Sequence, residues 1–385
     1  MNLKPESIEE LQALFRSDGL DAHGTSRSAL SQDSPRLLPR GGGSKPGLST
    51  PAQSAQTLEM SGLSGISAYV PEEFTFTALA GTRLAEVNRA LEENGQYLPF
   101  DPPLVERGAT LGGTVAAGLS GPGRYHYGGL RDFLLGVRFV DGQGNLVQAG
   151  GQVVKNAAGF DLPKLMIGSR GSLGALVELS FKVFPRPPAY ATLRCQCASL
   201  EEALQAMQRA AGSRLDVDAL DLEPSQGGYI LWVRLAGLAE IMDARLERLT
   251  GQVAEALQGE SQVLQGPDER QLWRLVNEFA WVPAEWSLVK VPLTPGRIAA
   301  LESALERKPI LRRYMAGGQA AWLALEGPPQ ELRGLLEEHR LSGLVLFGPP
   351  GAACLGEWVA GAGKTFYRRV KTALDPVGRF VEAAS

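Results

Sequence analysis

Three consecutive glycines stand between two cations in Arg40-Gly-Gly-Gly-Ser-Lys45, and this segment is well suited to hold an anion. Glycine has no Cβ, so successive glycines can adopt positive φ and turn several backbone N–H groups toward one point. The charges of Arg40 and Lys45 and the hydroxyl of Ser44 would add further donors. We therefore expect the following residues to form one wall of a diphosphate site: Arg40, Gly41, Gly42, Gly43, Ser44 and Lys45.

A second glycine cluster, with the sequence Gly-Ala-Thr-Leu-Gly-Gly-Thr, ends at Thr114. The hydroxyls of Thr110 and Thr114 can donate hydrogen bonds, and Gly112 and Gly113 would let the backbone approach a ligand closely. A single glycine run also occurs in surface turns, so the interpretation depends on several clusters acting together. We expect a turn over Ala109–Gly113 to supply the second wall of the site.

These clusters belong to an ordered set of motifs that resembles a known family. The motifs are Pro39–Lys45, Ala109–Gly113, Arg131-Asp132, Lys155–Leu162 and Gly168–Gly174. Together they resemble the FAD-binding domain of the vanillyl-alcohol oxidase type (PCMH fold) and, within it, the FAD-binding E subunits of bacterial glycolate oxidases. The resemblance spans about residues 35–188 and is only general over the C-terminal half.

The resemblance implies a set of FAD-binding residues. Around the diphosphate and the flavin it places Arg40 to Lys45 with Pro102, Thr110, Gly112, Gly113 and Thr114. On the flavin side it places Gly123, Arg124, Tyr127 and Gly128, and near the ADP moiety Gly171, Gly174 and Val177. For the less central glycines, a tight turn is the alternative interpretation.

Covalent attachment of FAD in this family uses a histidine or a cysteine near these loops. The first half of the chain contains no cysteine, and the triple-glycine segment contains no histidine. His126, in the glycine-rich segment that continues the second cluster to Gly129, is the one candidate, and a polar loop histidine is the alternative. We therefore expect FAD to be bound non-covalently.

The pattern of apolar residues predicts an α+β protein. It predicts an N-terminal helix and a connection over 1–34, a domain over 35–188, an α+β cap domain over 189–360, and a C-terminal helix and tail over 361–385. The resemblance implies that the domain over 35–188 is of the PCMH type, with two subdomains. The proline cluster Pro185-Arg-Pro-Pro188 marks the boundary between the two larger domains. Within 35–188 we expect strands at 37–39, 66–70, 74–78, 136–140, 146–149 and 176–184, and a helix over 84–94 that Gly95 ends.

The second half shows a repeated order of elements. A strand at 190–197, a helix at 200–211, strands at 215–222 and 228–235, a helix at 239–257 and a strand near 262 make one ferredoxin-like β-α-β-β-α-β unit. Elements near 287, 298, 310, 321, 332 and 344 make a second. Two such units predict one mostly antiparallel sheet.

Composition excludes several classes of function. A net charge of -4 and a pI near 5.7, without a basic segment, argue against a nucleic-acid surface. The chain has no long apolar stretch and no apolar signal region, so we expect a cytoplasmic protein. Its three cysteines cannot bind an iron–sulfur cluster, and Cys195 and Cys197 are expected to pack on one face of a strand. Gly361–Thr365 lacks the first glycine of a P-loop.

Histidine is scarce, and this limits what the chain can catalyse. Oxidation of a 2-hydroxy acid needs a base and cations for the carboxylate. Beyond residue 188 the only histidine is His339, in a charged helical stretch. Candidate carboxylate ligands are Lys290, Arg297, Arg312 and Arg313, with surface pairing as the alternative for each.

Three hypotheses follow. In the first, the chain is a non-covalent FAD subunit of a multi-subunit glycolate (2-hydroxy acid) oxidase or dehydrogenase, between a catalytic flavoprotein subunit and an iron–sulfur subunit, which could bring it to the cytoplasmic face of the inner membrane. In the second, it is a self-sufficient FAD dehydrogenase. In the third, it is a structural or assembly subunit without flavin.

The C-terminal helix ends at Asp375-Pro, as in the family, but the family's Asn-Pro-Gly-Arg ending is absent. This leaves docking of the tail against FAD open.

Overall fold

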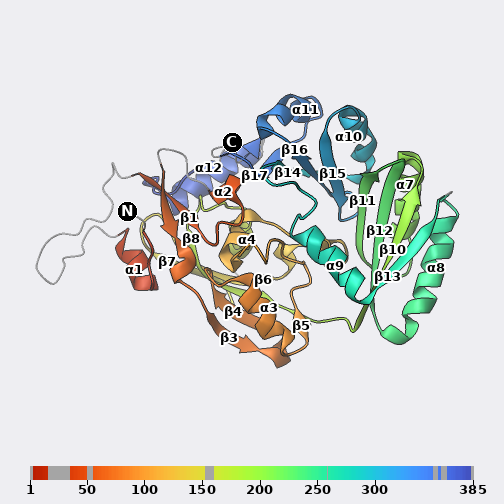
Figure 1. Ribbon diagram of the computed structural model, residues 1–385. Coiled ribbons are helices and arrows are strands. Elements are labelled where there is room, and N and C mark those ends of the chain that lie inside the picture. Colours follow the sequence, from red (N-terminus) through yellow and green to blue (C-terminus); the bar gives the residue numbers. More distant parts are fainter. Residues whose placement is uncertain are drawn as a thin grey trace, which may run out of the picture.

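The structure is a computed structural model (Figure 1). It describes residues 3–15, 35–49, 55–151, 160–257, 259–349, 354–356 and 362–382. The first half of the chain builds a five-stranded sheet and two small two-stranded sheets, and the second half builds a nine-stranded sheet beside them. The expected mixture of helices and antiparallel sheet is confirmed.

The five-stranded sheet has the order β3-β4-β8-β6-β7, and each neighbouring pair is antiparallel. Its strands are β3 (Ile66–Val70), β4 (Thr75–Leu79), β6 (Leu134–Val140), β7 (Leu146–Gly150) and β8 (Ala175–Lys182). A parallel pair, β1 (Arg36–Arg40) and β2 (Ala55–Glu59), forms a separate sheet that shares a buried core with β6 and β8, and β5 (Gln96–Tyr97) pairs with β9 (Phe184–Pro185). The predicted strands of this half are present, whereas β2 was not expected.

Six helices accompany these strands among the described residues. They are α1 (Ile8–Ala13), α2 (Pro46–Ser49), α3 (Leu84–Glu92), α4 (Leu111–Ala117), α5 (Arg124–Tyr127) and α6 (Leu162–Met166). Helix α3 buries Leu84, Val87 and Leu91, which recur at helical spacing, and Gly95 follows it with φ +63°. Helix α1 is shorter than the helical spacing over 6–17 suggests.

The predicted turn over Ala109–Gly113 is wrong, because this segment begins helix α4. Thr110 is its N-cap, and its Oγ1 accepts a hydrogen bond from the Gly113 N–H at 3.2 Å. Leu111 and Val115 are buried on one face. A satisfied N-cap and a buried apolar face stabilise the helix despite its two glycines.

The nine-stranded sheet has the order β13-β10-β12-β11-β15-β16-β14-β17-β18. Its strands are β10 (Ala189–Cys197), β11 (Val217–Ser225), β12 (Gly228–Gly237), β13 (Ser261–Gln265), β14 (Ser287–Pro292), β15 (Ile310–Met315), β16 (Ala320–Leu325), β17 (Gly343–Phe347) and β18 (Cys354–Leu355). The helices are α7 (Leu200–Ala211), α8 (Met242–Ala254), α9 (Gly266–Asn277), α10 (Ile298–Leu305), α11 (Arg333–Glu338) and α12 (Ala362–Leu374). The order is that of two split βαβ units joined edge to edge, as predicted.

Helix α9 was not expected. It begins after Gln265 with Pro267 in its first turn and Asp268 and Glu269 beside it, and it buries Trp273 and Val276. Short 3₁₀ turns complete the described connections at Met60–Gly62, Pro71–Glu73, Leu130–Asp132, Ala239–Ile241, Pro295–Arg297 and Pro329–Leu332.

The two faces of the nine-stranded sheet pack against different parts of the molecule. Val289 and Val291 belong to a core shared with helices α7, α8, α10 and α11. Leu288 and Trp322 instead join the core of the first half of the chain. Side chains alternate along a strand, so Lys290 on β14 points toward the first half. Cys195 and Cys197 are both buried in the first of these cores, as expected.

Candidate functional site

An open cleft with about 440 Å³ of empty space lies between the triple-glycine segment and helix α4. Strand β1 leads into the triple-glycine segment, and helix α2 begins directly after Lys45. The cleft is lined by Pro39, Arg40, Gly41, Gly42, Gly43, Ser44, Lys45, Leu48, Ser49, Thr110, Gly113, Ala116, Ala117 and Arg170. The two segments predicted to form opposite walls of an anion site are therefore neighbours in space.

A second cleft, with about 360 Å³ of empty space, adjoins the first and shares Gly41, Thr110 and Gly113 with it. It extends toward the third glycine cluster. Its lining adds Met60, Ala80, Gly112, Ser169, Gly171, Gly174 and Leu176. We call the two clefts together the cofactor cleft.

The first two glycines of the triple-glycine segment are needed for the contact between the walls. A Cβ on Gly41 would lie 2.0 Å from Thr110 Oγ1, and a Cβ on Gly42 would lie 1.8 Å from the carbonyl oxygen of Gly108. Of the three glycines, only Gly43 has positive φ, at +67°. Close packing between the two segments therefore explains Gly41 and Gly42 better than the unusual φ that the sequence suggested.

Lys45 is the most unusual charge in the cofactor cleft. Its side chain is buried, with 5% exposed, and its Nζ lies 2.9 Å from Ser44 Oγ. No ion pair joins it to an acid within the described residues. Burial lowers its pKa from 10.5 to about 8, and the more distant carboxylate of Glu278 opposes this only in part. A buried ammonium without a paired anion is unfavourable unless an anionic ligand completes it.

Two hydroxyls add unused hydrogen-bonding capacity beside the cleft. Ser169 Oγ and Thr114 Oγ1 are buried and have no hydrogen-bond partner among the described residues. Arg40 is less available than the sequence suggests, because its Nε lies 3.6 Å from Glu59 Oε1 in an ion pair. The donor set therefore centres on Lys45, with hydroxyls around it.

The residues expected on the flavin side lie outside the two clefts. Gly123 precedes helix α5 and donates its N–H to Asp101 Oδ2 at 3.0 Å, while Asp101 itself has φ +46°. Pro102, Arg124, Tyr127 and Gly128 lie in the same part of the chain. Val177 is fully buried in β8, where its carbonyl accepts the Ala80 N–H at 2.7 Å. Residues 155–159 of the Lys155–Leu162 motif lie outside the described residues.

Two residues that the sequence did not single out contact the site. Arg170, with φ +53°, lines the first cleft and contacts Cys354 Sγ. Glu278, at the end of α9, accepts the Glu106 N–H at 3.0 Å and so holds the segment that leads to Gly108. Arg170 lies inside the quoted Gly168–Gly174 motif, whereas no local pattern marks Glu278.

Residues 27–150 match a family model described as an FAD binding domain. This chain carries an FAD-binding domain. The domain's donor set fits the cofactor, because the buried Lys45 lines the first cleft and the unpaired Ser169 hydroxyl lines the adjoining one, and a diphosphate would supply the missing anion.

Curated relatives extend the match beyond the FAD-binding domain. Glycolate oxidase subunit GlcE of Escherichia coli is 42% identical over 224 residues, which cover 58% of this chain and 62% of that protein. Glycolate oxidase subunit GlcD of Bacillus subtilis is 28% identical over 180 residues, or 46% of this chain and 38% of that protein. A D-2-hydroxyglutarate dehydrogenase of Xanthomonas citri is 32% identical over 188 residues, or 48% and 36%. The matches thus span less than two thirds of these relatives.

A solved structure of alkyldihydroxyacetonephosphate synthase shares the fold, with a TM-score of 0.69 at 16% sequence identity. The match covers 99% of this chain and 75% of that protein. Both halves of this chain therefore share the fold of that structure.

Lys290 is a second buried cation, and it lies on the sheet face that packs against the FAD-binding domain. It is 9% exposed, and its Nζ lies 5.8 Å from the centre of the Trp322 ring. Burial, together with the neighbouring guanidinium of Arg124, lowers the pKa of Lys290 to about 8. Neither Lys290 nor Arg124 has an ion pair with an acid among the described residues. The other three candidate cations already have partners. Arg312 and Arg313 form ion pairs with Glu302 and Asp221, and Arg297 donates a hydrogen bond to the His339 carbonyl.

None of the helices among the described residues has the length and apolar character to cross a bilayer, and no group of histidine, cysteine and acidic side chains among these residues could hold a metal ion.

Proposed function

We propose that this chain is the non-covalent FAD-binding subunit of a multi-subunit glycolate (2-hydroxy acid) oxidase or dehydrogenase. In this role it relays electrons from a catalytic flavoprotein subunit toward an iron–sulfur subunit. It would work in the cytoplasm and reach the inner membrane only through its partners. The identity to glycolate oxidase subunit GlcE supports the proposal.

The observation that carries the proposal is Lys45 in the cofactor cleft. A buried ammonium beside two glycine-built walls gives the FAD diphosphate a charged anchor, with Ser44 as a neighbouring hydroxyl. The residues around it would bind and orient the cofactor: Gly41 and Gly42 keep the walls in contact, and Thr110 fixes the start of α4. Bound FAD supplies two-electron chemistry that can be passed on in single-electron steps.

The cysteines of this chain favour an electron acceptor on another chain. Burial raises the pKa of Cys195 to about 12 and that of Cys197 to about 11, so neither is a ready metal ligand. Cys354 is the only other cysteine in the sequence. Electrons leaving a reduced flavin would therefore pass to a cluster held by another chain.

The side chain of His126 supports non-covalent binding. It is exposed on α5, its ring lies 4.5 Å from that of Tyr127, and it lines neither cleft. Absorption spectra of the purified protein before and after acid precipitation test this point. We expect the yellow colour in the supernatant. Colour in the pellet would show a covalent bond and refute non-covalent binding.

The relay role is tested by reconstitution with glycolate and a dye. We expect no dye reduction by the FAD-loaded chain alone, and reduction once the catalytic flavoprotein subunit is present. A mixture that reduces the dye equally well with and without this chain would contradict the relay. Folded protein that does not take up added FAD would instead favour a structural subunit.

Lys290 and Arg124 favour a second candidate, a self-sufficient dehydrogenase. Lys290 is buried on the sheet face toward the FAD-binding domain, and Arg124 is half-buried on α5 of that domain. These two neighbouring cations without acid partners could hold a substrate carboxylate. In that case the purified FAD-loaded chain alone would reduce the dye with glycolate, and Lys290→Met would abolish this reaction. The same dye assay thus distinguishes the two candidates.

A further inference from the structure

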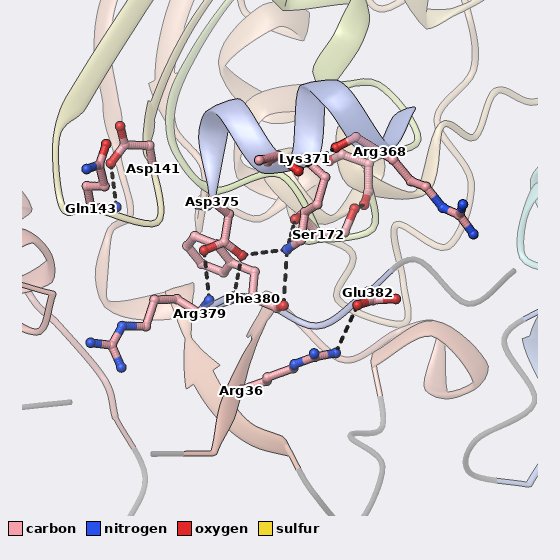
Figure 2. A network of polar contacts seen from close by, with 12 residues as sticks. Arg36, Asp141, Gln143, Ser172, Arg368, Lys371, Asp375, Arg379, Phe380 and Glu382 are labelled. Carbon is pink, nitrogen blue, oxygen red and sulfur yellow. Dashed lines mark hydrogen bonds and ion pairs between the residues drawn. The ribbon is translucent and has the colours of Figure 1, made fainter. Parts of the chain in front are cut away.

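The C-terminal segment contacts the strand and the loop that frame the cofactor cleft. Helix α12 ends at Leu374, and Asp375, which follows it, is only 3% exposed. As Figure 2 shows, its Oδ1 accepts the Arg379 N–H at 2.7 Å and its Oδ2 accepts the Phe380 N–H at 2.9 Å. One carboxylate therefore closes the turn that reverses the chain after the helix.

Lys371 lies one turn earlier on α12 and joins this turn to the third glycine cluster. Its Nζ donates to Asp375 Oδ2 at 2.5 Å, to the Phe380 carbonyl at 3.1 Å and to the Ser172 carbonyl at 2.6 Å (Figure 2). Ser172 follows Gly171, which lines the second cleft. A single ammonium thus connects the tail to a loop of the cofactor cleft.

The tail also pairs with strand β1, which leads into the triple-glycine segment. The Leu37 N–H donates to the Arg379 carbonyl at 2.7 Å, and the Val381 N–H donates to the Leu37 carbonyl at 3.0 Å. Phe380 is fully buried in a core with Leu37, and its ring lies 5.4 Å from that of Phe15. The tail therefore fixes β1 through both backbone and side chain.

Strand β1 and the third glycine cluster touch each other directly between these contacts. A Cβ on Gly171 would lie 2.8 Å from Pro39 Cδ, so the two segments are packed without a gap. Both segments line the cofactor cleft. Lys371 and the tail bind them at Ser172 and Leu37, which do not line it. A change in the tail would alter the spacing of Pro39 and Gly171 across the second cleft.

We propose that Lys371 and Asp375 are positioning residues for the cofactor, which set the width of the cofactor cleft although neither lines it. This inference rests on the proposed function, because it assigns the tail a part in retaining FAD. It predicts that FAD affinity responds to these two residues while the protein stays folded.

The test compares FAD affinity, measured by fluorescence titration of apo protein, in Lys371→Met, Lys371→Arg and Arg369→Met. Arg369 is exposed on the same helix and serves as the matched control. We expect Lys371→Met to bind FAD roughly tenfold or more weakly, since three charge-assisted hydrogen bonds are lost. Arg369→Met should bind as wild type does, and Lys371→Arg should recover much of the affinity. Equal affinity of folded Lys371→Met and wild type would overturn the proposal.

Two further measurements separate positioning from general stability. Circular dichroism at the titration temperature shows which variants are folded, and if Lys371→Met is not, the isosteric Asp375→Asn takes its place with the same expectation. Hydrogen exchange of apo protein should accelerate at Gly41–Gly43 and Gly171–Gly174 in the variant and not at β14. If wild-type protein binds no FAD, the proposed function fails, and unchanged exchange at the two glycine segments would overturn the positioning role independently.

Discussion

Replacing Lys45 with methionine should change the stability of the apo protein and its FAD affinity in opposite directions. Methionine keeps the apolar length of the side chain and removes the buried charge. Lowering the lysine pKa from 10.5 to about 8 corresponds, at 1.36 kcal/mol per pKa unit, to a cost of about 3 kcal/mol for keeping Lys45 charged in the apo protein near neutral pH. Because Lys45→Met removes this cost, we expect the free energy of unfolding of the apo protein to rise by roughly 1–3 kcal/mol.

The same change should weaken FAD binding. A charge-assisted hydrogen bond to phosphate contributes about 1.5–3 kcal/mol, so its loss corresponds to a roughly tenfold to hundredfold increase in Kd. Urea unfolding of apo protein and fluorescence titration with FAD measure the two effects. Lys182→Met is the matched control, because Lys182 is half-buried over the Phe133 ring and lies outside the cofactor cleft.

The pH dependence gives this prediction a second signature. Between about pH 8 and 10.5 the unfolded chain keeps the Lys45 proton and the folded apo protein releases it, so stability should rise with pH in this window. FAD affinity should fall as pH rises through about 8, because the neutral amine no longer attracts the diphosphate. Both trends should be reduced in Lys45→Met. An apo protein destabilised by Lys45→Met, with unchanged FAD affinity, would refute the assignment of Lys45 as the anion anchor.

Other changes test separate parts of the account. Gly42→Ala should weaken FAD binding by at least roughly tenfold, because its Cβ would overlap the Gly108 carbonyl oxygen, whereas Gly296→Ala, whose Cβ meets open space, should not; equal titrations would remove the loop contact from the account. Asp375→Ala should lower the free energy of unfolding by about 3–5 kcal/mol, because it leaves the Lys371 ammonium buried without its ion pair, and an unchanged urea midpoint would contradict this. Val177→Ala should destabilise the protein by about 1–3 kcal/mol without a selective loss of FAD affinity, since Val177 is a core residue; a normal urea midpoint with weakened FAD binding would place Val177 at the cofactor instead.

Much of the fold could be predicted from the sequence because local patterns carry it. The apolar spacing of Leu84, Val87 and Leu91 specifies α3, and the repeated strand and helix order predicts two split βαβ units. Helix α4 was missed because glycine disfavours helices, and the buried partners of Leu111 and Val115 cannot be seen locally. Helix α9 could have been found from Pro267 and the acidic residues that follow it.

The candidate site, like the fold, could be predicted from the sequence only in part. Glycine spacing located both walls of the cofactor cleft, but the reason for Gly41 and Gly42 depends on a contact between distant segments. The burial of Lys45, the ion pair of Arg40 with Glu59 and the role of Glu278 also arise only from tertiary packing. The placement of Pro102, Gly123, Arg124, Tyr127 and Gly128 at the flavin stays a prediction.

The central claim is that this chain binds FAD through a diphosphate anchor at Lys45. Titration of folded apo protein with FAD, repeated in the presence of ADP as a competitor that carries only the diphosphate end, tests it most directly. We expect wild-type protein to bind one FAD per chain in competition with ADP, and we expect Lys45→Met, but not Lys182→Met, to bind both FAD and ADP more weakly. Folded wild-type protein that binds no FAD, or FAD binding that neither ADP nor Lys45→Met weakens, would contradict the claim.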